Sequence, residues 1–236
     1  MLLVRPSLPG DIPAQRELWS LAFGDESAYV DNFYSTYYRP ERVLVLEENG
    51  LVRSMTAWFD TTFVVPGRGN YRAAYLYAVA THPDCRGRGL AGHLLAEADW
   101  YFRDLEIPAV TTVPAEPSLH SFFGANGFRE CFVHGQFSGA PDASPTGPAP
   151  ELESLTAERY VLLREQLLAS LPHIALDQEA IAYQEGACRL SGGGLYALAC
   201  QHGLVLLCAE GMEDGRLLVK ELLGPPMARD HALTWL

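Results

Sequence analysis

The 236-residue sequence has no paired cysteine motif and almost no lysine. Its five cysteines are an odd number, and no two of them have the Cys-x-x-Cys spacing of a zinc site or a redox motif. This pattern argues against a disulfide framework and is typical of reduced side chains that fill a core. Lys220 is the single lysine among 17 basic residues, a bias that we attribute to base composition.

Long apolar runs and a basic leader are also absent. No run approaches the roughly 20 residues that a membrane-spanning helix needs. The first residues, MLLVRPSLPGDIP, lack the pattern of a signal peptide, so we expect a cytoplasmic protein that does not bind membranes. The net charge of −12 disfavours binding to nucleic acid or to anionic membranes. It leaves room for a small anionic ligand that is held by local positive charge.

A segment rich in proline and glycine divides the chain. Residues 138–150 contain no large apolar side chain, which predicts a semi-extended linker. Hydrophobic residues make up 48% of the sequence and charged residues 19%, the balance of a globular protein. We therefore expect one domain over residues 1–137 and a smaller α/β segment over residues 151–236.

The first segment alternates between helical and strand patterns. Asp11 precedes an apolar stripe and is predicted to cap a helix, which a second helix over 26–38 follows. Further along, strands are predicted at 2–5, 43–47, 51–59, 62–65, 71–81, 108–113 and 128–137, and helices at 89–102 and 118–125.

The second segment looks like a weak, partial copy of the first. Helices are predicted at 155–169, 177–184 and 227–236, with strands at 195–200, 204–209 and 217–222. Residues 197–205 align with residues 44–52, although two unrelated hairpins would also give this short match. Pro225 and Pro226 occupy the strand–helix turn and donate no N–H groups, so no phosphate site is expected there.

A loop with two arginines and three glycines follows the strand at 71–81. Arg86-Gly-Arg-Gly-Leu-Ala-Gly92 opens a helix, whose first N–H groups and positive dipole end attract anions. Glycine lets the backbone approach an anion closely, and arginine adds charge-assisted donors. The loop therefore predicts a phosphate-bearing ligand. Cys85, beside it, is either a reactive thiol or an ordinary loop residue.

The loop is compatible with two classes of phosphate ligand. Gly87, Gly89 and Gly92 satisfy the dinucleotide pattern Gly-x-Gly-x-x-Gly, which by itself is a weak signal for a nucleotide-dependent oxidoreductase. That pattern begins directly after the first strand of a βαβ unit, whereas four residues intervene here. The preceding strands also have the pattern of an antiparallel meander.

The residues fit a second family better. Arg86-Gly-Arg-Gly-Leu-Ala91 resembles the acetyl-CoA loop [QR]-x-x-G-x-[GA] of the GNAT N-acetyltransferase superfamily. Phe122-Phe-Gly-Ala-Asn-Gly-Phe128 resembles the late family element in which a short helix ends in Gly-Phe. The resemblance covers residues 1–137, and a tandem second half is similar to the branch of the enhanced-intracellular-survival type acetyltransferases.

The resemblance implies a fold and a cofactor. It implies an α/β (α+β type) fold with a mixed, mainly antiparallel twisted sheet that is flanked by helices, and acetyl-CoA in a gap of that sheet. The pantetheine arm would pair with the strand near Val79 and Thr81, and Val79 N–H would stabilise the oxyanion. The pyrophosphate would lie on the N–H groups of Gly87, Arg88, Gly89, Leu90 and Ala91, with the side chains of Arg86 and Arg88 nearby. No metal is expected.

The sequence departs from the family at the general acid. Many members have a tyrosine four residues before the glycine of Gly-Phe, where this chain has Phe123. Glu116 and His120 are the candidate base and acid, since they would lie one turn apart if the helix began early. In the alternative interpretation, Glu116 completes the first turn and His120 faces solvent. Tyr75 and Tyr77 share one face of the strand and line either the acceptor pocket or the core.

These observations predict an N-acetyltransferase that moves an acetyl group from acetyl-CoA to an amine of a small molecule or a peptide. A non-catalytic acyl-CoA-binding or sensing module is the alternative, because Phe123 cannot donate a proton. The identity of the amine and the oligomeric state, including a homo-oligomer, stay open.

Overall fold

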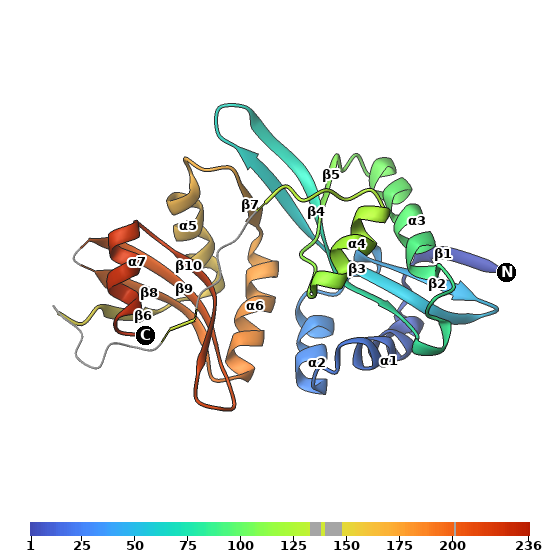
Figure 1. The fold of residues 1–236 in the computed structure, drawn as a ribbon, viewed down its shortest axis with the longest axis horizontal. Coiled ribbons are helices and arrows are strands. Elements are labelled where there is room, and N and C mark those ends of the chain that lie inside the picture. Colours follow the sequence, from blue (N-terminus) through green and yellow to red (C-terminus); the bar gives the residue numbers. More distant parts are fainter. Residues whose placement is uncertain (133–137, 140–147, 201) are drawn as a thin grey trace. The chain divides into compact units, whose positions relative to one another are not determined.

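The structure is a computed structural model that describes residues 1–132, 138–139, 148–200 and 202–236. It divides into two compact units, Met1–Val133 with Pro172–Leu176, and His134–Leu171 with Asp177–Leu236 (Figure 1). Most of the segment predicted as a linker, 140–147, lies outside the described residues. Residues 172–176, which the sequence assigned to the second segment, group with the first unit.

The first unit is built on a mixed, mainly antiparallel sheet, as the sequence predicted. Its strands lie in the order β1-β2-β3-β4-β5, and β7 pairs with β3. Every pairing is antiparallel except that of β4 with β5. The strands are β1 (Leu2–Pro6), β2 (Val43–Glu48), β3 (Leu51–Val65), β4 (Gly69–Thr81), β5 (Ala109–Thr111) and β7 (His173–Leu176).

The β2–β3 hairpin turns at Asn49 and Gly50, whose φ angles are 54° and 82°. A two-residue turn with two positive φ angles favours the Asn-Gly dipeptide, so the predicted hairpin is confirmed. The separate strand expected at 62–65 is the continuation of the 15-residue β3. This outer half of β3 pairs with β7 from Thr61 to Val64.

Helices cover the two faces of this sheet. They are α1 (Ile12–Phe23) and α2 (Ser27–Thr36) on one face, and α3 (Leu90–Asp104) and α4 (Pro117–Ala125) on the other. Two consecutive side chains on β4 point to opposite faces of the sheet and contact different helices. Leu76 packs in an apolar cluster with Leu94 of α3. The ring of Tyr77 lies 5.5 Å from that of Trp19 on α1.

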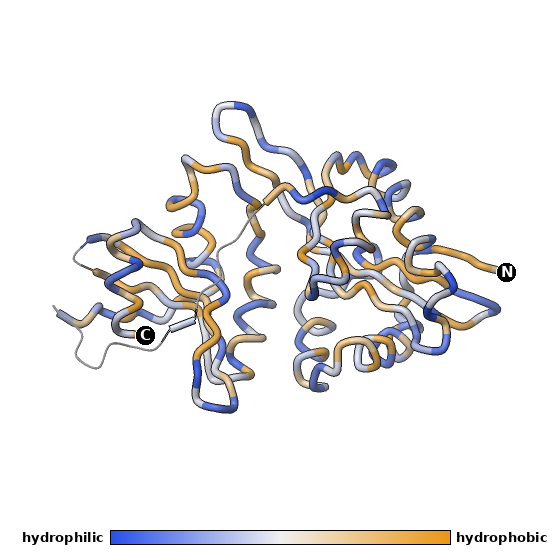
Figure 2. Tube along the Cα trace, viewed as in Figure 1, coloured by the Kyte–Doolittle hydropathy of each residue, from blue (hydrophilic) through white to orange (hydrophobic). Residues whose placement is uncertain are grey.

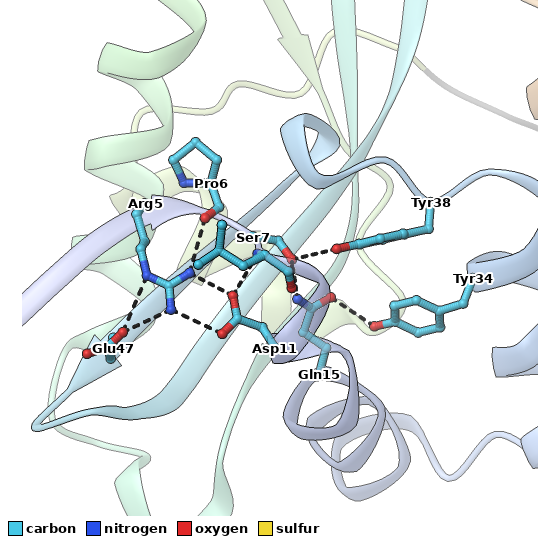
Figure 3. Close-up of polar contacts among 9 residues, drawn as sticks. Arg5, Pro6, Ser7, Asp11, Gln15, Tyr34, Tyr38 and Glu47 are labelled. Atoms are coloured by element: carbon cyan, nitrogen blue, oxygen red, sulfur yellow. Dashed lines mark hydrogen bonds and ion pairs between the residues drawn. The ribbon is translucent and has the colours of Figure 1, made fainter.

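Arg5 ties β1 to β2 and to the start of α1 (Figure 3). Its Nη1 donates to Asp11 Oδ2 at 2.6 Å, and its Nη2 donates to Glu47 Oε2 at 2.9 Å. The hydrogen bond from Arg5 lowers the pKa of Asp11. Asp11 is the N-cap residue of α1, the position that the sequence predicted, but its side chain does not cap the helix. Its carboxylate accepts the N–H of Leu8 and the Arg5 guanidinium, and caps no N–H of α1.

A buried chain of hydrogen bonds joins both helices to the end of β1 (Figure 3). Gln15 on α1 donates from Nε2 to Ser7 Oγ at 2.5 Å, and Ser7 Oγ also contacts Tyr38 Oη at 2.9 Å. Tyr34 of α2 donates to Gln15 Oε1 at 3.1 Å. Ser7 and Gln15 are buried, so every partner in the chain is needed to satisfy their polar atoms.

The second unit has an antiparallel four-stranded sheet in the order β10-β9-β8-β6. Along β9, Leu207 packs against Ala228 and Ala232 on one face, and Cys208 points to Cys188 on the other. Hydrophobic residues follow these strands, while the β9–β10 turn is hydrophilic (Figure 2). The elements are β6 (Glu151–Ser154), α5 (Ala157–Leu168), α6 (Gln178–Leu190), β8 (Gly194–Cys200), β9 (Gly203–Gly211), β10 (Leu217–Leu223) and α7 (Pro226–Leu233).

Three strand expectations need correction. The sequence missed β6 and β7, which are four residues long each. It also predicted a strand or hairpin over 128–137, where residues 128–132 have no regular structure and 133–137 lie outside the described residues. Residues 129–132 are all exposed, so they lack the buried face that stabilises a strand. Within the described part of the chain, no helix is long and apolar enough to span a bilayer.

Candidate functional site

The strands β4 and β5 part after a short contact. Their parallel ladder covers only Ala73–Tyr75 against Ala109–Thr111. Among the described residues, no strand is paired with Ala78–Thr81 on the side of β4 that faces away from β3. Backbone N–H and C=O groups at such an edge need a partner, and a ligand with amide groups can pair there like an added strand.

A bulge lies where the strands part. The β3–β4 register shifts between Met55 and Ala57, so that Ala78 and Val79 together stand opposite Thr56. Ala78 has a φ of 50°, a left-handed conformation that is rare for alanine. Bulges re-aim the backbone and are common beside active sites. The predicted oxyanion donor, Val79 N–H, belongs to this bulge.

The glycine loop joins the end of β4 to α3. Gly87 and Gly89 have φ angles of 74° and 77°, a region that favours glycine, and α3 begins at Leu90. The N–H groups of Leu90 and Ala91 have no acceptor within the helix because they belong to its first turn. These donors lie at the positive end of the helix dipole, where N–H groups without an acceptor attract anions.

The two arginines of the loop have different surroundings. Arg88 donates from Nη1 and Nη2 to the two carboxylate oxygens of Glu48, at 3.0 and 2.6 Å, and this hydrogen bonding lowers the pKa of Glu48. Arg86 is exposed and donates from Nε to the carbonyl oxygen of Thr81 at 3.3 Å. An anion at the loop would therefore compete with Glu48 for Arg88, whereas no described carboxylate is hydrogen-bonded to Arg86.

The other predicted binding residues offer backbone groups. The side chain of Leu90 is buried in the apolar cluster under α3, and Val79 packs against that cluster. Thr81 Oγ1 lies 2.8 Å from the buried Ser54 Oγ, so this hydroxyl is already paired. The side chain of Cys85 is buried in the same apolar cluster, so Cys85 is not the exposed loop residue that the sequence suggested.

The short helix α4 ends against the first turn of α3. A Cβ on Gly92 would lie 3.2 Å from Asn126 Oδ1, so glycine allows this close approach. Phe123 is 7% exposed and belongs to the apolar cluster, with its ring 5.2 Å from Phe122 and 5.3 Å from Phe128. The position therefore holds a packed apolar ring and no hydroxyl.

Glu116 and His120 have separate partners. Glu116 precedes α4 as its N-cap residue, and its Oε2 accepts a hydrogen bond from Ser118 Oγ at 3.3 Å. His120 Nδ1 lies 2.8 Å from Glu130 Oε1. The helix does not begin early enough to give the predicted i, i+4 pair. Sequence reasoning missed Glu130 because it lies in the segment that was expected to be a strand.

The opposite face of β4 presents tyrosines. Tyr77 Oη lies 3.1 Å from Tyr29 Oη on α2, and both side chains are half-buried. Tyr75 stacks on Phe59 with 6.1 Å between ring centroids. Tyr29 was missed because a contact between residues 48 positions apart leaves no local signal in the sequence.

The surroundings of the loop differ from those of a dinucleotide site. β4, α3 and the parallel β5 form a βαβ unit, but the 3-10 turn Pro83–Cys85 separates β4 from the glycines, whereas the dinucleotide pattern begins directly after the strand. The other neighbour of β4 is the antiparallel β3. Among the described residues, no group of three or more His, Cys, Asp and Glu side chains is placed to hold a metal ion.

Comparisons with known proteins agree with this geometry. A family model described as "Acetyltransferase (GNAT) domain" matches residues 4–128. No curated protein matches. Among solved structures, Eis1 from Mycobacterium abscessus is 12% identical, with a TM-score of 0.65, and the match covers 100% of this chain and 62% of that one. A GCN5-related N-acetyltransferase from Anabaena variabilis is 14% identical, with a TM-score of 0.66 and the same coverage.

A third structure, a GCN5-related N-acetyltransferase from Kribbella flavida, is 18% identical with a TM-score of 0.64. That match covers 99% of this chain and 60% of the other. The chain therefore spans less than two thirds of the length of these structures. At such identities the likeness is one of fold.

The bulge gives a stability prediction. Ala78→Gly should change the free energy of unfolding by less than about 0.5 kcal/mol, because relief of the positive φ offsets the added freedom of the unfolded chain. Ala78→Val should cost about 1–3 kcal/mol. Ala80→Gly, the matched control on the same strand, should cost about 1 kcal/mol. Denaturant unfolding measures all three, and equal losses at Ala78→Gly and Ala80→Gly would contradict the bulge.

Proposed function

Because the chain belongs to the GNAT acetyltransferase family, we propose that it transfers an acetyl group from acetyl-CoA to an amine of a small molecule or a peptide. One observation carries the proposal: three features follow one another along the chain. They are the bulge of β4, the end of β4, which has no described strand partner on the side away from β3, and the start of α3 after the glycines. Together they offer backbone groups of β4 that can pair with amides of a ligand, the N–H group of Val79 at the bulge, and N–H donors for an anion at the start of α3.

The residues present fit acetyl-CoA through their backbone. The amide groups of the pantetheine arm would pair with Ala78–Thr81 on the side of β4 that faces away from β3, where no described strand is paired with it. The pyrophosphate would accept hydrogen bonds from the N–H groups of Gly87–Ala91. Arg86 would add a charge-assisted hydrogen bond to a phosphate oxygen, since it is exposed and has no carboxylate partner among its hydrogen bonds.

The reaction proposed is direct attack of a neutral amine on the thioester that acetyl-CoA supplies. Val79 N–H, on the bulge, would donate to the oxygen on which negative charge develops. His120 and Glu116 remain the candidates for taking the proton of the amine and protonating the departing thiolate. The carboxylate of Glu130 lies 2.8 Å from His120 Nδ1 and orients the ring.

We also propose that the face with Tyr29, Tyr75 and Tyr77 borders the amine acceptor. Their phenol rings are half-buried and lie on the side of β4 that faces α1 and α2. Aromatic rings suit a cationic acceptor because their faces attract positive charge. The net charge of −12 favours the same class of acceptor.

The second unit is proposed to be a partial copy of the first without its own cofactor site. Its strand order β6-β8-β9-β10, with two helices after the first strand and one after the last, parallels β1-β2-β3-β4. At the turn that corresponds to the glycine loop, Pro225 and Pro226 begin α7. Neither residue donates an N–H group, so a phosphate would find few donors there.

A non-catalytic module that binds acyl-CoA is the second candidate function. The buried apolar surroundings of Phe123 support it, because a hydroxyl that protonates the thiolate is missing at this position. The two functions share acetyl-CoA binding and differ in turnover.

Replacement of Arg86 tests the binding site. Arg86→Ala should weaken acetyl-CoA binding roughly 10–150-fold, because it removes one charge-assisted hydrogen bond to phosphate. Arg68→Ala, at the β3–β4 turn, is the matched control and should bind as the parent does. Isothermal titration calorimetry measures both. Unchanged affinity in Arg86→Ala would place the cofactor elsewhere.

The catalytic proposal is tested at His120. His120→Ala should lower turnover of an accepted amine about 10²–10⁴-fold, as expected for loss of a positioned acid or base, and should leave acetyl-CoA binding unchanged. Phe123→Tyr should gain little, because the new hydroxyl would enter an apolar cluster. His202→Ala, an exposed histidine of the second unit, is the control. Release of free CoA over a panel of amines reports turnover.

Two outcomes would contradict this assignment. Turnover that rises strongly in Phe123→Tyr and is unchanged in His120→Ala would show that the missing tyrosine is the only acid that matters. If the parent and both variants bind acetyl-CoA but release no CoA with any amine, the binding-module function replaces the enzyme.

A further inference from the structure

Two cysteines of the second unit lie in contact inside its core. Cys188 on α6 and Cys208 on β9 have their Sγ atoms 3.5 Å apart. Their exposed fractions are 0% and 3%. A disulfide has an S–S distance of about 2.05 Å, so a small movement of the side chains would bring the two atoms into bonding range. The transfer reaction proposed above uses neither residue.

The backbone holds this pair together. The carbonyl oxygen of Cys188 accepts hydrogen bonds from Ser191 N, Ser191 Oγ and Gly193 N, at 3.2, 2.9 and 2.8 Å. A Cβ on Gly193 would overlap the backbone carbonyl of Ala209, the residue after Cys208. The last turn of α6 therefore lies directly against β9, and the sulfur contact is part of that packing.

The environment makes the two thiols unlike each other. The two sulfur atoms share one hydrogen bond, and Gln184 Nε2 donates to Cys188 Sγ at 3.5 Å. The bond with Cys208 and then the bond from Gln184 outweigh burial and lower the pKa of Cys188 to about 7. Lys220 acts in the same direction and Glu210 opposes it. The bond to Cys188, together with burial, raises the pKa of Cys208. The opposite directions of the two pKa shifts favour Cys188 as the thiolate and Cys208 as the thiol.

We propose that Cys188 and Cys208 form a dithiol site that hydrogen peroxide oxidises to a disulfide. The Cys188 thiolate attacks one peroxide oxygen, the O–O bond breaks, and Cys188 sulfenic acid and hydroxide form. The sulfur of Cys208 then attacks the sulfenic sulfur and the S–O bond breaks. The Cys208 proton leaves with that oxygen as water. In sum, two thiols and one peroxide give one disulfide and two waters.

Oxidation cross-links α6 to β9. The two cysteines are 20 residues apart, with β8 between them. A cross-link over such a loop restricts the unfolded chain, so the oxidised second unit should unfold at a higher temperature than the reduced one. Thiol reductants should reverse the change.

The test uses the full chain with Cys131→Ser, which removes the exposed thiol that would link two molecules. After treatment with hydrogen peroxide, remaining thiols are alkylated and the peptides are mapped by mass spectrometry. The expected result is a cross-linked peptide that contains Cys188 and Cys208, lost on reduction, together with a higher thermal midpoint. Cys85 and Cys200 should remain thiols during the peroxide treatment and be found alkylated in the peptide map. A folded protein in which all four thiols remain, or in which another pair is linked, would overturn the proposal.

Single variants test the order of the two steps. In Cys208→Ser, a sulfenic acid should accumulate at Cys188 and be trapped by dimedone. In Cys188→Ser the bond to the Cys188 thiol is lost, but burial still raises the pKa of Cys208, so trapping there at neutral pH should be roughly tenfold less than at Cys188 in the other variant. Cys200→Ser is the control and should keep the cross-link. Equal trapping at both sites would contradict the roles assigned. If a variant fails to fold, the peptide map of the parent still decides whether the site exists.

Discussion

The parting of β4 from β5 is the constraint on which the rest of the first unit depends. Backbone N–H and C=O groups inside a sheet are satisfied by the neighbouring strand, and here the parallel ladder ends at Tyr75. The chain continues as β4 to Thr81, and the short turn Pro83–Cys85 leads into the glycine loop. A strand edge and a helix start are thus joined by a few residues. A ligand that carries amides at one end and phosphates at the other matches both.

Other features of the unit hold this arrangement in place. The bulge at Ala78 turns the backbone where the strands part, and β3 supports it from the other side. Trp58, Leu76 and Leu94 fill the core beneath α3. On the opposite face, Arg5 and the chain of hydrogen bonds through Ser7 fix α1 and α2 beside β1 and β2. The tyrosines of β4 are thereby held at a defined place.

The sequence predicted features whose physical cause is local. The Asn-Gly hairpin, the glycine loop and the apolar stripe of α3 each depend on neighbouring residues. It could not predict contacts between distant segments, such as Arg88 with Glu48, 40 positions away, or β7 with β3. Residues His173–Leu176 form a strand because they pair with the edge of β3. Four residues are too few to show the alternation of apolar and polar side chains that predicts a strand. The contact between His120 and Glu130 also joins α4 to a separate segment, so helical spacing alone paired His120 with Glu116 and missed Glu130.

Hydrogen–deuterium exchange of the full chain, with and without acetyl-CoA, tests the central claim most directly. The account predicts slower exchange of the amides of Val79, Thr81 and Gly87–Ala91 when acetyl-CoA is present, because the ligand would accept hydrogen bonds from them. Gly224 and Met227, at the corresponding turn of the second unit, should exchange as before. Protection at that second turn, or no protection in β4 and the glycine loop despite saturating acetyl-CoA, would contradict it.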